Sequence, residues 1–210
     1  MDQLYYAPGA ASMLVHWILI ELDAPHELRL VDTGAGAQKS AEYLALNPNG
    51  VVPTLVHGGV PMYEAAALAM TLADRHPQAG LVPAIDDASR AAHTQWMFNL
   101  ANMVQPLFRQ WWYPHEPAGP EHAEAVRSHV APRIEAAWAR IDAHLAGNGP
   151  FLLGDRPSIA DFYLTMLMRW SRNMPRPATH WPQLAALAQH MASRASFATL
   201  YEREGLTEWP

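Results

Sequence analysis

The spacing of apolar residues changes once along this chain, near residues 80–87. Before this point, short strand-like runs take turns with helical stretches, in the order strand, helix, strand, helix, strand, strand, helix. After it, the apolar spacing is that of helices throughout, broken only by Pro and Gly clusters. The sequence therefore predicts a small α/β domain over residues 1–80, followed by an all-α domain over residues 87–210.

Composition narrows the classes of function. The 210 residues include no Cys, which excludes disulfides, thiolate metal sites and an enzyme cysteine nucleophile. The net charge is −6 and no basic stripe is present, so we expect no nucleic-acid partner. No apolar run reaches the roughly 18–20 residues that span a bilayer, and the start MDQLYYAPG lacks the features of a signal peptide. We therefore expect a cytoplasmic protein that does not bind membranes.

The stretch QLYYAPGAASMLVHW, residues 3–17, has the pattern of a strand that turns abruptly into a helix. A short apolar run ends at a Pro-Gly turn, and Ser12 opens a dense apolar segment. A helix N-terminus collects free backbone N–H groups and the positive end of the helix dipole. The stretch therefore predicts an anion site at the start of this helix.

A second helix start is marked by Ser158 and Asp161. They follow Gly154-Asp155-Arg156-Pro157 and precede an apolar run. The spacing is that of a capping box with Asp in place of Glu, in which each side chain bonds the other residue's backbone N–H. We interpret this motif as structural.

Four segments in this order resemble the glutathione S-transferase superfamily. They are the strand–Pro-turn–helix start, NPNGVVPTL, YEAAALAMTLADRHP and, in the helical half, GDRPSIADFYL. The resemblance covers essentially the whole chain, and the nearest relatives look like bacterial enzymes whose first turn reads PGACS. It implies a thioredoxin-like N-terminal domain followed by an all-helical C-terminal domain.

The resemblance also implies where glutathione binds. Val52-Pro53 stands where the family has a cis-proline, with the Val52 backbone turned outward to pair with the cysteinyl part of the peptide. Glu64 would contact the γ-glutamyl amino group. Ala65 replaces the usual Ser, so only backbone amides remain there for the γ-glutamyl carboxylate. Lys39, the only lysine, would face the glycyl carboxylate; the alternative is a coding bias toward Arg.

The anion at the first helix would then be the glutathione thiolate. Ala11 stands where the nearest relatives have Cys, and Ser12 follows it. Ser12 would donate its hydroxyl or its N–H to the sulfur, and Tyr6 is the second candidate because other branches of the superfamily use Tyr or Ser. The alternatives are that Ser12 is only an N-cap and that Tyr6 only packs. We assign His16 to the core.

The helical half offers further candidates. Asn99 and Gln105 fall near where relatives place polar groups over the sulfur, although Gln105 cannot act as a general base. The aromatic cluster Phe108, Trp111, Trp112 and Tyr113 has two interpretations, a wall for an apolar electrophile or the packing of a helix end.

The resemblance therefore implies a homodimeric transferase that binds glutathione as co-substrate, stabilises its thiolate and conjugates it to an apolar electrophile without a metal. A glutathione-dependent isomerase or lyase on the same scaffold is the first alternative. A non-catalytic binding protein is the second, and the alanines at positions 11 and 65 favour it somewhat.

Overall fold

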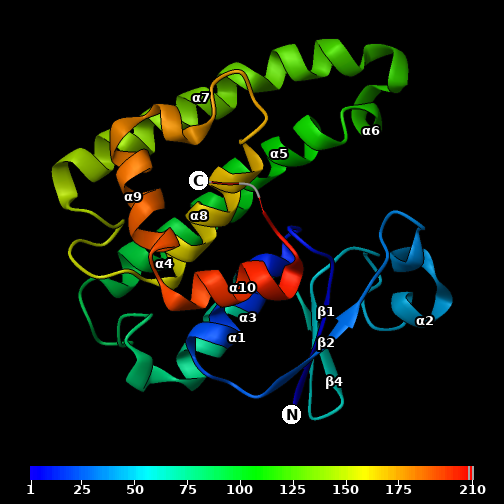
Figure 1. The fold of residues 1–210 in the computed structure, drawn as a ribbon, viewed down its shortest axis with the longest axis horizontal. Coiled ribbons are helices and arrows are strands. Elements are labelled where there is room, and N and C mark those ends of the chain that lie inside the picture. Colours follow the sequence, from blue (N-terminus) through cyan, green and yellow to red (C-terminus); the bar gives the residue numbers. More distant parts are fainter. Residues whose placement is uncertain (208, 210) are drawn as a thin grey trace. The chain divides into compact units, whose positions relative to one another are not determined.

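The computed structural model describes residues 1–207 and 209, and these form two compact units (Figure 1). The first unit comprises residues 1–82 together with 193–207, and the second comprises residues 83–192 with Trp209. The sequence analysis assigned 193–207 to the helical domain, whereas the structure groups this segment with the first unit. The end of that predicted domain, residues 208 and 210, lies outside the described residues.

The first unit is built on a mixed four-stranded sheet with the order β2-β1-β3-β4. The strands are β1 (Asp2–Tyr6), β2 (His26–Leu30), β3 (Thr54–His57) and β4 (Val60–Tyr63). β1 and β2 are parallel, and the other two pairs are antiparallel. Gly58 and Gly59, both at positive φ, make the two-residue turn between β3 and β4. The predicted thioredoxin-like domain is confirmed.

The strand register brings three chain segments to one end of this sheet. Tyr5 near the end of β1 lies opposite Thr54 at the start of β3, and Thr54 lies opposite Tyr63 at the end of β4. The residues that follow β1, precede β3 and follow β4 therefore share this end.

The helices of the first unit are α1 (Ser12–Glu21), α2 (Ala41–Leu44), α3 (Ala65–Arg75) and α10 (Ala195–Glu204), with 3₁₀ turns η1 (Ala37–Lys39) and η2 (Pro77–Ala79). α1 is buried from Ser12 to Leu19, because β1, α3 and α10 all pack against it. Its apolar character on every face therefore reflects burial on every face. Leu14 and Trp17 of α1 and Leu68 and Leu72 of α3 are among the buried residues of this core.

The second unit is helical, which confirms the predicted C-terminal fold. Its elements are α4 (Arg90–Asn99), the π-helical turn η3 (Leu100–Val104), α5 (Gln105–Trp112), α6 (His115–Ala118), η4 (Pro120–His122), α7 (Ala123–Asn148), α8 (Ile159–Trp170), η5 (Ala178–His180) and α9 (Pro182–Ala192). α8 lies at the centre of this unit and is buried from Ile159 to Arg169. Among the helices of the described residues, none combines the length and apolar character that crossing a bilayer requires.

The predicted capping box begins α8. The Ser158 side chain accepts from the amide at the third helical position, and the Ser158 N–H donates to Asp161 Oδ2 at 2.7 Å. Asp161 Oδ1 also accepts the Leu152 N–H at 2.8 Å, so this carboxylate joins the helix start to the preceding loop. The motif therefore fixes the entry into the most buried helix of the unit.

Ser158→Ala is expected to lower the free energy of unfolding by about 1 kcal/mol, because one helix-start amide loses its acceptor. Denaturant unfolding of wild type and variant measures this difference. A loss below a few tenths of a kcal/mol would mean that water replaces the hydroxyl without cost.

Candidate functional site

The turn between β1 and α1 presents backbone amides rather than a hydroxyl. Ser12 Oγ accepts the Ala7 N–H at 3.1 Å and donates to the Ala7 carbonyl at 3.0 Å, and Ser12 is 0% exposed. The N-cap residue Ala11 makes no side-chain cap. In the described part of the chain, the N–H groups of Ala11 and Ser12 have no hydrogen-bond acceptor. These two amides are therefore the groups at this helix start that are available to bind an anion.

Tyr6 ends β1 just before this turn and is half-buried. Burial raises the pKa of the Tyr6 hydroxyl, and the negative charge of Glu204 raises it further. The hydroxyl therefore keeps its proton at neutral pH and is suited to donate a hydrogen bond, not to act as a base.

The loop before β3 is held from behind by two buried side chains. The Tyr43 hydroxyl and the Asn47 amide both donate to the Val51 carbonyl, each at 2.8 Å. The Val52–Pro53 bond is cis, as expected. The Val52 N–H and C=O have no partner within residues 1–207 and 209, so both are available to an extended peptide.

The roles of Tyr43 and Asn47 were not predicted from the sequence. Asn47 begins the segment NPNGVVPTL, which was used only for the resemblance. A side chain that bonds a backbone group a few residues away is typical of Asn in turns, and this signal was available in the sequence.

Glu64 has a backbone conformation that residues other than Gly rarely adopt. Its φ is 75° and its ψ is 107°, and its side chain is exposed. Such a conformation costs on the order of 1–3 kcal/mol and is found most often at ligand sites. Glu64 is also the N-cap of α3 but makes no side-chain cap, so the amides at the start of this helix, from Ala65 on, are left open.

Lys39 lies at the end of η1, beside the same loop. Its Nζ donates to the Asn49 carbonyl at 3.3 Å. Gly50 has a φ of 59°, which favours glycine, and a Cβ there would lie 2.7 Å from Lys39 Nζ, so the lysine side chain would have to shift. The only lysine of the chain thus contacts the backbone two to three residues before Val52.

Asn99 and Gln105 belong to the second unit. Asn99 is exposed at the end of α4, Gln105 begins α5, and the π-helical turn η3 separates them. A π-turn changes the angular position of the residues that follow it, and such turns are frequent at functional sites. Gln105 Oε1 accepts a hydrogen bond from the Tyr163 hydroxyl. The proposed contact of Asn99 and Gln105 with glutathione stays a prediction.

The aromatic cluster of α5 divides into a buried part and an exposed part. Phe108 is buried and contacts the rings of Trp138 and Trp170, as the packing interpretation predicts. Trp112 and Tyr113 are exposed, and Tyr113 lies under the guanidinium of Arg109 at 4.2 Å. Only the exposed part is left as a candidate wall for an electrophile.

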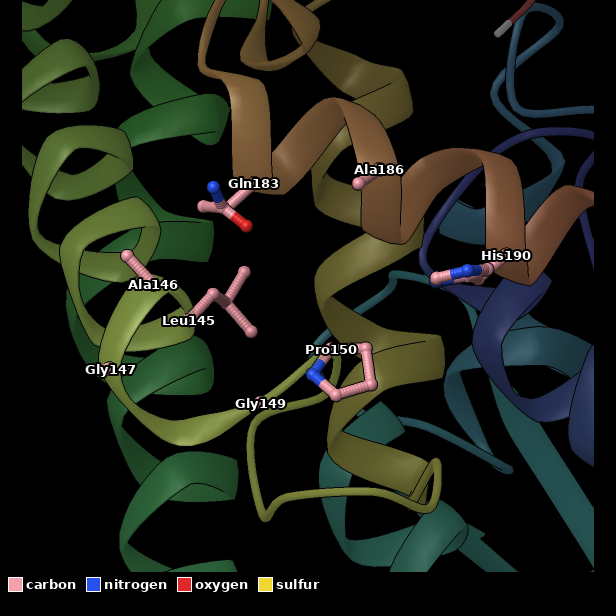
Figure 2. Close-up of a pocket in the computed structure, with 8 residues that line it drawn as sticks. All are labelled: Leu145, Ala146, Gly147, Gly149, Pro150, Gln183, Ala186 and His190. Carbon is pink, nitrogen blue, oxygen red and sulfur yellow. The ribbon is translucent and has the colours of Figure 1, made fainter.

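The second unit also contains a hollow of about 360 Å³ between the end of α7 and α9 (Figure 2). It is lined by Leu145, Ala146, Gly147, Gly149, Pro150, Gln183, Ala186 and His190. None of the predicted site residues belongs to it, so we leave it out of the candidate site.

Family models identify the class of protein. The model of the glutathione S-transferase N-terminal domain matches residues 4–80, and that of the C-terminal domain matches residues 124–193. The chain therefore belongs to the glutathione S-transferase superfamily.

Individual relatives agree with this assignment. A glutathione S-transferase from Xanthomonas campestris is 34% identical over 97% of this chain and 99% of its own. The crystal structure of a Sulfitobacter glutathione transferase homologue with bound glutathione has a TM-score of 0.90 and 28% identity, over 99% of both chains. A maleylacetoacetate isomerase from Pseudomonas aeruginosa is 27% identical over 77% of this chain and 76% of its own.

Proposed function

We propose that this protein is a glutathione transferase that conjugates glutathione to an apolar electrophile. The observation that carries the proposal is the register of the sheet. It brings Tyr6, Val52 and Glu64, with the backbone next to each, to one end of one sheet.

Each part of glutathione has a matching group. The γ-glutamyl carboxylate binds the amides at the start of α3, at Ala65, and the Glu64 carboxylate pairs with the γ-glutamyl ammonium. The cysteinyl part pairs with the Val52 N–H and C=O in the manner of an added strand. The Lys39 ammonium, beside the loop that leads to Val52, attracts the glycyl carboxylate.

The thiolate is stabilised at the start of α1. The amides of Ala11 and Ser12 donate to the sulfur, the helix dipole adds a favourable field, and the Tyr6 hydroxyl is a further donor. The Ser12 hydroxyl holds the turn through Ala7 instead. The thiolate then attacks the electrophile and forms a carbon–sulfur bond. Either a leaving group departs with its electron pair, or a double bond is saturated and its other carbon takes a proton from water.

Calorimetry with glutathione, followed by an assay with a generic aromatic halide electrophile, tests the proposal. Saturable binding and conjugation above the rate with glutathione alone are expected. Binding without turnover of any electrophile would favour the non-catalytic alternative, and no binding would reject the proposal. Gel filtration measures the proposed homodimer.

A glutathione-dependent isomerase is the second candidate, because one relative is named a maleylacetoacetate isomerase. Conjugation consumes glutathione, whereas isomerisation returns it. Measuring free thiol during turnover of maleylacetoacetate and of the aromatic halide therefore separates the two activities.

Ala65→Ser is expected to bind glutathione about tenfold more tightly, which corresponds to about 1.4 kcal/mol. The new hydroxyl would donate a charge-assisted hydrogen bond to the γ-glutamyl carboxylate. Calorimetry measures the change. Ala195→Ser, which adds a hydroxyl at the first residue of α10, is the matched control and should leave affinity unchanged. Equal or weaker binding by Ala65→Ser would count against this placement.

A further inference from the structure

The last residue of α10 contacts the turn that precedes α1. Glu204 Oε2 accepts the Gly9 N–H at 2.7 Å, and Glu204 Oε1 lies 2.8 Å from His16 Nδ1. The side chains of Glu204 and His16 are both 0% exposed. A carboxylate withdrawn from water requires such partners, so these contacts fix its position.

α10 is also anchored to α1 at a second place, where the start of α10 meets the end of α1. The Arg194 guanidinium and the Ser196 hydroxyl donate to the Glu21 carboxylate, and Trp17 Nε1 donates to Ser196 Oγ at 2.9 Å. Figure 1 shows α10 lying along α1. The contacts of Glu21 do not involve the turn, whereas the contact of Glu204 with Gly9 does.

We propose that Glu204 is a positioning residue for the thiolate: by holding the Gly9 amide, it sets the direction of the Ala11 and Ser12 amides that face the sulfur. The proposal rests on the proposed function. Gly9 lies two residues before Ala11, within the turn between Ala7 and Ser12. Ser12 holds the start of this turn through Ala7, and Glu204 holds its middle through Gly9. Together they immobilise the backbone from which the two amides project.

The negative charge of Glu204, taken alone, would raise the pKa of the bound thiol, whereas its positioning of the two amides lowers this pKa. A negative charge near a thiol disfavours the thiolate, as it disfavours the ionised form of Tyr6. His16 of α1 contacts this carboxylate directly, and the charge of Glu204 acts on Tyr6 of β1. One layer further out, the ring of His26 on β2 lies against His16, and Arg203 of α10 contacts His26. A purely electrostatic role and a positioning role therefore predict opposite signs when Glu204 is replaced.

The test compares Glu204→Ala and Glu204→Gln with Glu21→Ala, which removes a carboxylate of the other anchor. The readouts are thiolate absorbance of bound glutathione against pH, glutathione affinity at a pH where the thiol stays protonated, and hydrogen exchange of the Gly9 amide. Only variants that still unfold cooperatively are compared. Glu204→Ala should raise the pKa of the bound thiol by about one unit and speed Gly9 exchange about tenfold or more.

The other variants should behave differently. Glu204→Gln keeps an oxygen for the Gly9 N–H and loses the charge, so the thiol pKa should stay or fall. Glu21→Ala should lower stability and leave both the thiol pKa and Gly9 exchange unchanged. Affinity for protonated glutathione should change less than about threefold in all three variants.

Two outcomes would overturn the inference while the proposed function stands. One is a wild-type thiol pKa in Glu204→Ala, and the other is a thiol pKa that falls equally in Glu204→Ala and Glu204→Gln. A wild-type protein that binds no glutathione would instead reject the proposed function, and the role of Glu204 with it.

Discussion

Ala11→Pro is expected to raise the pKa of the bound glutathione thiol by roughly one to two units. Proline removes the Ala11 N–H, and the φ of Ala11, −61°, is one that proline adopts. A hydrogen bond to an anion contributes about 1.5–3 kcal/mol, and one pKa unit corresponds to about 1.4 kcal/mol. Because the amide stabilises only the charged sulfur, the loss should fall on the thiolate and not on the binding of protonated glutathione. Thiolate absorbance against pH measures the shift.

Ser12→Ala tests whether the Ser12 hydroxyl, and not the backbone amides, contacts the thiolate. Its hydroxyl bonds both polar groups of Ala7, so its loss leaves the Ala7 N–H buried without an acceptor. We expect about 1–3 kcal/mol less stability and a nearly unchanged thiol pKa, because the Ser12 amide stays in place.

The reverse pattern, with a shifted pKa in Ser12→Ala and none in Ala11→Pro, would return the thiolate contact to the Ser12 hydroxyl. A shift only in Tyr6→Phe would assign it to Tyr6.

The second large effect is a dependence of folding stability on pH, which we expect from the Asp161 carboxyl. Burial raises the pKa of its carboxyl from 3.8 to about 6, against the hydrogen bonds from Leu152 and Ser158 that lower it. The folded state therefore binds a proton more tightly than the unfolded chain. The stabilisation is fully present below pH 3.8 and is lost as the pH rises through about 6, to a total of about 3 kcal/mol.

Asp161→Asn cannot show this dependence, because its side chain does not titrate. Its amide also turns a donor toward one of two backbone N–H groups, so at pH 4 the variant should be less stable than wild type by at least about 1 kcal/mol. The stability gap between wild type and variant should shrink as the pH rises from 4 to 7. Denaturant unfolding across this range measures the gap.

Asp142→Asn is the control, since Asp142 also accepts backbone N–H groups at a helix start but is partly exposed. A gap for Asp161→Asn that grows with pH would show that the hydrogen bonds to the carboxylate outweigh burial.

Much of the fold could be predicted because the signals are local. The Gly58-Gly59 turn, the apolar stretch after Ser12 and the box of Ser158 and Asp161 each depend on residues a few positions apart. Periodicity over such short spans reports which face of an element is buried. The positions of Val52 and Glu64 came from the resemblance, and the register of the sheet shows that they share one end.

The sequence by itself determined the order of the elements, the change to helices near residue 80, and the absence of any cysteine for the chemistry. Tertiary structure alone decided where the Ser12 hydroxyl points, and that α10 belongs to the first unit. It also decided that Glu204 meets Gly9, 195 positions earlier in the chain. A buried carboxylate takes whichever donors packing brings within reach, and no local pattern encodes a partner so distant.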